Sequence, residues 1–157
     1  MIEIERKFLV KTDAFKVDAF KSTQITQGFL NTDKARTVRV RVKGDVGFLT
    51  VKGLSTSDGL ERFEWEKTIN LADAEALLKL CEKGVINKIR HEVKLGNHVF
   101  EVDEFLDDNL GLVVAEVELK SKTETFLKPN WLGQEVTGQT KYYNSQLSQS
   151  PYNTWGL

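Results

Sequence analysis

The chain of 157 residues carries 22 lysines and arginines against 23 aspartates and glutamates, which gives a formal net charge of −1. A nearly neutral chain has no global field to attract nucleic acid or an anionic membrane, so any anion site must be a local cluster of cations. Its single cysteine excludes an intrachain disulfide, and its length fits one domain, residues 1–157, with a core of its own.

No run of about 18 apolar residues occurs in the sequence, so we expect neither a membrane-spanning helix nor a membrane partner. The charged segment at residues 2–8 begins the chain without an apolar signal segment before it. Together with the lone cysteine, which suits a reducing compartment, these features predict a cytoplasmic location.

Short runs of β-branched and aromatic residues that alternate with polar residues predict that most of the chain forms β-strands. The pairs Gly44-Asp45 and Gly96-Asn97 lie between such runs and predict tight hairpin turns. Eight strands commonly close a sheet, so we expect a mainly β (α+β) fold, a closed eight-stranded antiparallel barrel that forms a tunnel, with flanking helices. The expected strands are residues 2–10, 24–31, 37–43, 47–53, 61–69, 85–94, 98–105 and 113–120.

One longer helix is expected at residues 71–83, with Asn70 as its N-cap and Gly84 at its end. A shorter helix is expected at residues 122–127, where Pro129 follows, and a third at residues 141–147. We expect residues 54–59 to form a polar loop and Trp155 to pack the C-terminal tail against the body of the protein.

Charged residues occupy every second position in several strands, so they share one face of each strand. The first strand places Glu3, Glu5 and Lys7 on such a face. A solvated face usually mixes neutral and charged residues, whereas here the charges sort by strand, and like charges on one face repel unless an ion or ligand neutralises them. The acidic pairs are Glu64/Glu66, Glu101/Asp103 and Glu116/Glu118, and the basic sets are Arg39/Arg41/Lys43 and Lys88/Arg90.

A closed sheet would turn these charged faces toward a wet lumen and the apolar faces outward under helices. Carboxylate oxygens bind hard divalent cations such as Mg²⁺, and Arg and Lys bind phosphate oxygens. The pattern therefore indicates a metal-chelated polyphosphate as the guest of the lumen. Exposed cross-strand ion pairs, which contribute little to stability, would produce the same pattern and remain the alternative.

The charged segments also match, in order and over nearly the whole chain, the motifs of a known family. They are ExExK at residues 3–7, RVRVK at 39–43, TVK ending at Lys52, ERFEWE at 61–66, KIR at 88–90, FEVD ending at Asp103, AEVEL at 115–119 and GQEVTGQTKYYN at 133–144. On these motifs the chain resembles the CYTH superfamily, the triphosphate tunnel metalloenzymes. Its appearance is closest to the small bacterial members that resemble inorganic tripolyphosphatases.

This resemblance implies an antiparallel tunnel that binds a triphosphate and a divalent metal, and in-line attack of water on a terminal phosphorus. The implied metal is Mg²⁺, or alternatively Mn²⁺, with the ligands Glu3, Glu5, Glu116 and Glu118. The implied phosphate-binding residues are Lys7, Arg39, Arg41, Lys52, Lys88, Arg90 and Lys141. The implied catalytic residues are Lys7, Glu64, Glu66 and Asp103. The carboxylates of the last three would hold a second metal or orient the attacking water.

One position departs from the pattern of the family. Phe29, in the segment at residues 27–30, stands where relatives often carry Tyr. A hydroxyl that would bind phosphate or tune an acid is therefore absent, which leaves the metal and phosphate scheme intact and the selection of substrate less defined.

We expect metal-dependent hydrolysis of inorganic tripolyphosphate to pyrophosphate and phosphate, because the compact chain offers no extra segment for a base or thiazole pocket. Three alternatives stay open: a class IV adenylate cyclase that makes cyclic AMP from ATP, a hydrolase of thiamine triphosphate or nucleoside triphosphates, and a non-catalytic module that binds polyphosphate or a nucleotide. The complete set of carboxylates favours an enzyme over a binding module. The expected partner is the small triphosphate and not nucleic acid, and a homodimer is left open.

Overall fold

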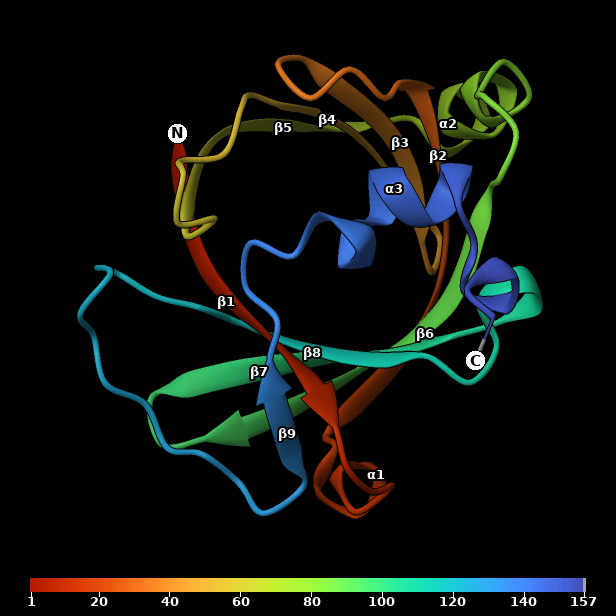
Figure 1. The fold of residues 1–157 in the computed structure, drawn as a ribbon. Helices are drawn as coiled ribbons and strands as arrows, with labels where there is room; N and C mark the ends of the chain where they lie inside the picture. Colours follow the sequence, from red (N-terminus) through yellow and green to blue (C-terminus); the bar gives the residue numbers. More distant parts are fainter. Residues whose placement is uncertain (157) are drawn as a thin grey trace.

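Eight antiparallel strands close into a barrel in the computed structural model, which describes residues 1–156 (Figure 1). The order around the barrel is β5-β4-β3-β2-β6-β7-β8-β1, and pairing of β1 with β5 closes the ring, which confirms the expected barrel. A further strand, β9 (Leu132–Glu135), pairs with β1. The barrel strands are β1 (Ile2–Val10), β2 (Lys21–Asn31), β3 (Thr37–Lys43), β4 (Val46–Lys52), β5 (Glu61–Ile69), β6 (Ile86–Leu95), β7 (His98–Phe105) and β8 (Val113–Glu118).

The helices are short, and several expectations about them are wrong. The helix expected at residues 71–83 begins after the Asn70 cap but ends at Leu78, because the backbone N–H of Glu82 turns to the carbonyl oxygen of Phe29 at 2.8 Å. Residues 122–127 form no helix, since the side chain of Glu124 accepts the backbone N–H of Lys120 and holds a turn there. The helical segments are α1 (Phe15–Asp18), α2 (Leu71–Leu78), α3 (Asn144–Gln149), and the 3-10 turns η1 (Asp107–Asn109), η2 (Thr140–Tyr142) and η3 (Tyr152–Thr154).

The sequence missed α1 and β9 because each spans only four residues, too few for a periodic pattern. The helix expected at residues 141–147 is instead divided between η2 and α3. Within residues 1–156, no helix reaches the length and apolarity that a bilayer crossing by a helix requires.

Two apolar clusters pack against the sheet, one on its outer face and one at an end of the barrel. In the first, Phe15 and Trp131 cover the outer face of the sheet, where Trp131 meets Phe15 and Phe100 edge to face with ring centroids 5.9 and 5.7 Å apart. In the second, Tyr142 and Leu147 from the C-terminal segment pack with other buried residues at one end of the barrel (Figure 1, blue). The first cluster buries apolar faces outside the lumen, so the alternating charged faces point inward. The second cluster contains Ile86 and Val114, which share the inward faces of Lys88 and Glu116, so it fills one end of the lumen.

The barrel closes between β1 and β5 through only a short stretch of strand pairing, and we call this junction the seam. β1 pairs with β5 only from Ile2 to Ile4, and then with β9 from Phe8 to Val10. Between these pairings, the backbone N–H of Glu5 donates to the carbonyl oxygen of Leu60 at 3.1 Å, and that of Lys7 donates to Thr137 Oγ1 at 2.9 Å. The loop before β5 and the segment after β9 therefore close the wedge between the strands.

These two segments meet at Gly59 and Gly138. A Cβ atom added to Gly59 would lie 2.3 Å from the Cα of Gly138, and Gly59 has a φ of +75°. We expect Gly59→Ala to lower the unfolding free energy by roughly 2 kcal/mol or more, of which about 1–2 kcal/mol is the left-handed backbone and the rest is displacement of Gly138. Urea denaturation measures this loss.

Gly156→Ala is the matched control for that substitution. Gly156 has a φ of +72°, and nothing lies within 4 Å of the Cβ it would gain. It should therefore lose no more than the cost of the backbone conformation. Equal losses for the two variants would show that the close approach of Gly59 to Gly138 does not stabilise the seam.

Candidate active site

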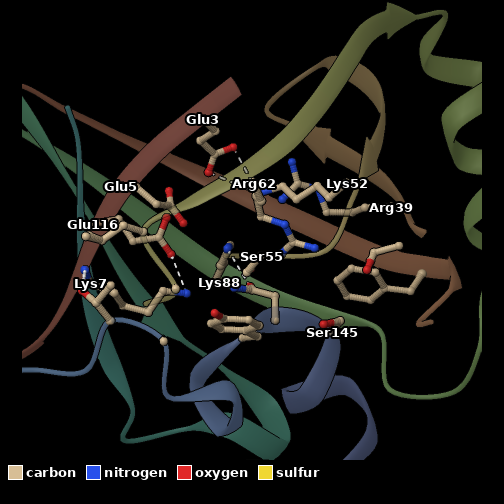
Figure 2. A pocket seen from close by; sticks show the side chains of 18 of the residues that line it. Glu3, Glu5, Lys7, Arg39, Lys52, Ser55, Arg62, Lys88, Glu116 and Ser145 are labelled. Carbon is tan, nitrogen blue, oxygen red and sulfur yellow. Dashed lines mark hydrogen bonds and ion pairs between the residues drawn. The ribbon is translucent and has the colours of Figure 1, made fainter. Parts of the chain in front are cut away.

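The inward faces of the strands meet in one cavity inside the barrel (Figure 2). Alternation along each strand explains the convergence, because every second side chain faces the lumen. Register adds to it, since Glu5 of β1 lies opposite Glu118 of β8, and Lys7 lies opposite Glu116. The predicted site residues that line the cavity are Glu3, Glu5, Lys7, Arg39, Lys52, Lys88, Arg90 and Glu116.

The carboxylates of β1 and β8 are crowded on one wall of this cavity. Burial raises the pKa of Glu5 well above its usual value, and the negative charges of Glu116 and Glu3 raise it further. Only part of this charge is offset inside the protein: Lys7 Nζ lies 3.2 Å from Glu116, and Lys52 Nζ lies 3.3 Å from Glu3. Such a wall favours a cation that would neutralise Glu5.

A basic group stands on the opposite side, where Glu66 is held among cations. Glu66 Oε2 accepts from Thr50 Oγ1 at 2.7 Å and lies 3.3 Å from Arg39 and 3.4 Å from Arg41. Burial lowers the pKa of Arg41 to about 9, and the neighbouring cations Arg39 and Arg90 add to this effect. Among the described residues, the Nε atoms of Arg39 and Arg41 are buried without a hydrogen-bond partner. Two unpaired guanidinium N–H groups call for an anion in the lumen.

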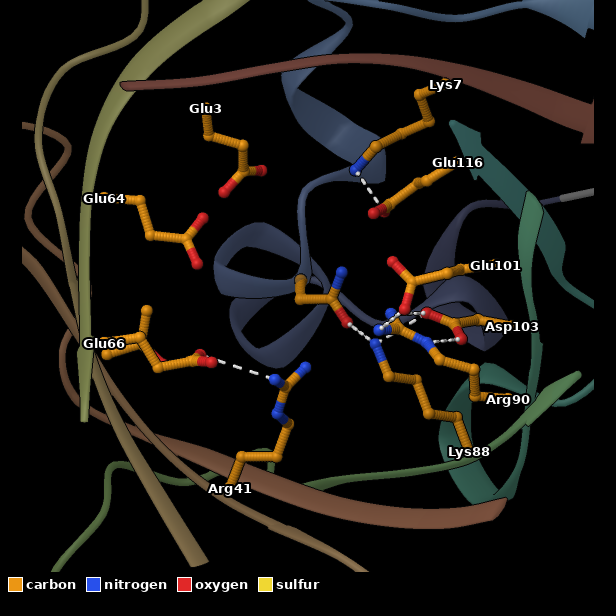
Figure 3. Close-up of polar contacts among 12 residues, drawn as sticks. Glu3, Lys7, Arg41, Glu64, Glu66, Lys88, Arg90, Glu101, Asp103 and Glu116 are labelled. Carbon is orange, nitrogen blue, oxygen red and sulfur yellow. Dashed lines mark hydrogen bonds and ion pairs between the residues drawn. The ribbon is translucent and has the colours of Figure 1, made fainter. Parts of the chain in front are cut away.

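Asp103 ties two further cations together, as Figure 3 shows. Its Oδ1 accepts from Arg90 Nε at 2.8 Å, and its Oδ2 lies 2.8 Å from Lys88 Nζ. Burial lowers the pKa of Lys88 to about 8 against the attraction of Asp103. Both oxygens of Asp103 thus bind cations, which suits a residue that positions Lys88 and Arg90. The sequence led us to expect instead that Asp103 orients water or binds a metal.

The remaining predicted acids occupy less central places. Glu64 of β5 points into the barrel in Figure 3, and its nearest cation is Lys52, with Nζ at 3.4 Å. Glu118 is exposed and lines a second cleft with Glu101, apart from the main cavity. Burial raises the pKa of Glu118, and repulsion from Glu3 and Glu101 raises it further. Its charge therefore still interacts with the carboxylates of the acidic wall.

Two predicted phosphate-binding residues are not among those that line the cavity: Arg41, which lies beside Arg39 at Glu66, and Lys141. Lys141 lies apart from the other predicted site residues. Its side chain is exposed, and its Nζ lies 5.1 Å from the ring of Tyr142 and 4.9 Å from that of Trp155. The turn η2 buries Tyr142 and directs Lys141 away from the lumen. We therefore withdraw Lys141 from the candidate site.

The cavity is also lined by residues that the sequence motifs did not point to. Arg62 lines it and donates from Nε and Nη2 to the carbonyl oxygen of Gly53 at 3.1 and 2.8 Å. The ring of Tyr143 lies 5.2 Å from Lys7 Nζ, and Asn144 accepts from Lys88 Nζ at 2.9 Å. Arg62 lies two positions before Glu64 on β5, so alternation along the strand could have predicted that it faces the lumen. Tyr143 and Asn144 lie in a segment without periodicity, where no such pattern exists.

Phe29 also lines the cavity, so the hydroxyl that a tyrosine would place there is missing from the site itself. The sequence located this departure correctly in the lumen. The uncharged polar side chains that line the cavity include Thr37, Ser55, Tyr143 and Asn144.

The donor set fits a hard divalent cation that arrives with its ligand. In the described part of the chain, no three carboxylate, imidazole or thiolate groups stand close enough to form a metal site by themselves. Mg²⁺ commonly uses one or two carboxylates and takes its other oxygens from water and substrate phosphates. Glu3, Glu5 and Glu116, crowded on one wall of a cavity that Arg39 and Arg90 also line, suit that mode of binding better than a closed protein cage.

Known proteins are similar to this chain in sequence and in fold. A family model described as the CYTH domain matches residues 1–151. A curated inorganic triphosphatase from Acetivibrio thermocellus is 47% identical over 154 residues, which cover 98% of this chain and 97% of that protein. An inorganic triphosphatase from Nitrosomonas europaea is 35% identical over 154 residues, which cover 96% and 99% of the two chains.

A solved structure adds a comparison in three dimensions. A crystal structure of an inorganic triphosphatase superposes with a TM-score of 0.64 at 32% sequence identity, and the match covers 93% of this chain and 97% of that one. The barrel, the ordered charged motifs and the family match agree over almost the same residues. The chain belongs to the CYTH domain family.

Proposed function

We propose that this protein hydrolyses inorganic tripolyphosphate to pyrophosphate and phosphate inside the barrel, with Mg²⁺, or alternatively Mn²⁺, as its metal. The observation that carries the proposal is one cavity lined both by the carboxylates of Glu3, Glu5 and Glu116 and by the cations Arg39, Lys88 and Arg90. The buried Nε atoms of Arg39 and Arg41, which have no hydrogen-bond partner among the described residues, add to it. A polyanion bridged to the carboxylates by a divalent cation satisfies both groups at once. The relatives named inorganic triphosphatases support the same substrate class.

In this proposal the cations of the chain do most of the chemical work. Arg39, Arg41 and Arg90 bind non-bridging phosphate oxygens, and Lys7, Lys52 and Lys88 add point charges. These fixed charges stabilise the negative charge that spreads over the phosphoryl group as water attacks the terminal phosphorus in line. The bond from that phosphorus to the bridging oxygen breaks, and pyrophosphate leaves. The proton lost by the water passes to solvent or to a phosphate oxygen.

The carboxylates divide into two kinds of role. Glu3, Glu5 and Glu116 would hold the metal, with Glu118 at the edge of the same wall; when bound, the metal withdraws charge from the phosphate oxygens. Glu64 is the candidate for orienting the attacking water, because one lysine is its only recorded ion-pair partner within the described residues. Glu66 and Asp103 are both occupied by cations, and we assign them to positioning Arg39, Arg41, Lys88 and Arg90.

The lining of the cavity supports an inorganic chain over a substrate with an organic group. Phe29, Leu60 and Tyr143 are its largest apolar side chains, and the ring of Tyr143 already faces Lys7 at 5.2 Å and Arg62 at 6.0 Å. A purine or a thiazole ring would find few free apolar partners there. A cyclase would in addition need a base beside a ribose hydroxyl, for which no residue of the cavity is set apart.

The substrate is tested by comparing initial rates with tripolyphosphate, ATP and thiamine triphosphate under excess Mg²⁺. We expect the highest kcat/KM for tripolyphosphate. Cyclic AMP formed from ATP would move the protein to the lyase class. Tight binding of all three compounds without any turnover would contradict the hydrolase assignment and favour a binding module.

Arg41→Ala tests the phosphate-binding wall. The substitution removes a guanidinium group that would bind tripolyphosphate. It also removes one of the two arginines that lie near Glu66. We expect kcat/KM to fall by about tenfold to a hundredfold, the loss of one charge-assisted hydrogen bond in the complex, with a melting temperature within a few degrees of wild type. Steady-state kinetics and thermal unfolding measure the two effects. A large fall in melting temperature with little change in kcat/KM would make Arg41 a structural ion-pair residue instead.

A further inference from the structure

The C-terminal segment reaches into the lumen through Asn144, the first residue of α3. Its Oδ1 accepts a hydrogen bond from Lys88 Nζ at 2.9 Å and another from Gln27 Nε2 at 2.8 Å. The segment lies across one end of the barrel in Figure 1, and tertiary packing of Leu147 and Tyr142 anchors it there. Asn144 is therefore presented to the cavity by a packed element and not by a free tail.

The chemistry of Lys88 gives this contact a consequence. The ammonium group has three N–H donors and no acceptor, and it sits at the end of a flexible four-carbon stem. Asp103 Oδ2 takes one donor at 2.8 Å, and Asn144 Oδ1 takes a second. Lys88 is 1% exposed and lines the cavity, so its remaining N–H is the one available to a ligand in the lumen.

Lys88 fixes the orientation of the Asn144 amide, and Gln27 holds it there. The ammonium of Lys88 can only donate, so it requires the amide oxygen of Asn144 and excludes the amide nitrogen from that position, and Gln27 Nε2 donates to the same oxygen. Gln27 is 0% exposed and cannot replace this bond with one to bulk water. The amide is held from two strands, β2 and β6, and cannot rotate without leaving two buried donors unpaired.

We propose that Asn144 is a positioning residue that, together with Asp103, directs the third N–H of Lys88 toward the phosphate chain. This inference rests on the proposed function, since it assigns a role in binding the triphosphate. It replaces Lys141, which the sequence suggested as the contribution of the C-terminal segment, by a residue three positions later that acts through a lysine of β6.

The test is a double-substitution cycle in which binding, and not turnover, is read out. Calorimetry with tripolyphosphate and EDTA measures affinity in wild type, Asn144→Ala, Lys88→Ala and the double variant. We expect Asn144→Ala to weaken binding by about tenfold, the effect of one misdirected bond to a charged group. In the Lys88→Ala background the same substitution should change affinity less than about twofold, because Asn144 acts through Lys88.

A second variant separates positioning from folding. Gln146→Ala lies on the same helix and is not among the side chains that contact Lys88, so it should bind like wild type. If Asn144→Ala costs as much in the Lys88→Ala background as in wild type, or if Gln146→Ala weakens binding equally, the proposal is wrong.

The outcome is independent of the reaction assigned above. A wild-type protein that binds tripolyphosphate but does not hydrolyse it would overturn the proposed function and leave the cycle fully interpretable. A protein that hydrolyses tripolyphosphate, with additive losses in the cycle, would keep the function and overturn the role of Asn144.

Discussion

Replacing Glu5 by glutamine is expected to lower Mg²⁺-dependent hydrolysis of tripolyphosphate by at least about a hundredfold, beyond the 10–100-fold typical of a lost outer-sphere partner of a metal. The melting temperature of the metal-free protein should stay the same or rise. Glu5 is buried beside Glu116 and Glu3, and burial and their repulsion raise its pKa, so the neutral amide removes an unfavourable charge from the folded state. Activity and stability should therefore move in opposite directions, as they do at sites built for a ligand.

The control for this variant is Glu75→Gln, which removes an exposed carboxylate from α2 and should change neither quantity. Phosphate release and thermal unfolding without metal are measured on all three proteins. Glu5→Gln with nearly full activity would contradict the metal-holding role of the acidic wall. A variant that loses both activity and many degrees of melting temperature would show that Glu5 stabilises the barrel instead.

Asp103→Asn is expected to be the most destabilising substitution in the lumen. Asp103 is 2% exposed and binds both Lys88 and Arg90, so its neutral replacement leaves two buried cations without their shared counter-charge. Loss of one partner from a buried ion pair costs about 3–5 kcal/mol. At about 2–4 °C per kcal/mol for a chain of this size, the melting temperature should fall by roughly 10 °C.

Glu101→Gln is the matched control, because Glu101 binds the same Arg90 at 2.8 Å but has a side chain that is 34% exposed. An ion pair of that kind contributes about 1 kcal/mol or less. If Asp103→Asn kept its stability and lost activity, Asp103 would act directly on water or metal, as the sequence motif implied. Thermal and urea unfolding of the two variants decide between these roles.

The sequence predicted most of the barrel because its signals are local. Alternation places Glu3, Glu5 and Lys7 on one face of β1, and the structure confirms that all three line the cavity. The hairpin at Gly96-Asn97 joins β6 and β7 as expected. A period of two residues and a turn dipeptide can both be read within ten positions of the chain, and neither depends on what packs against the strand.

The rest depended on contacts between distant residues. Lys7 meets Thr137 across 130 positions, and Lys88 meets Asn144 across 56, so no local pattern shows which side chain of the C-terminal segment turns inward. The helix expected at residues 122–127 yields to packing, since Phe126 contacts the rings of Phe8 and Phe100 with centroids 5.9 Å apart in each case. Tertiary contacts of this kind override helix propensity.

The central claim is that the charged lumen cleaves a triphosphate, and phosphorus-31 NMR of tripolyphosphate with excess Mg²⁺ tests it most directly. The proposed reaction consumes one water and releases one phosphate for each pyrophosphate. We therefore expect both signals to grow in equal molar amounts with wild-type protein and to stay absent with Glu5→Gln. An unchanged tripolyphosphate spectrum, or phosphate without accumulating pyrophosphate, would contradict the account.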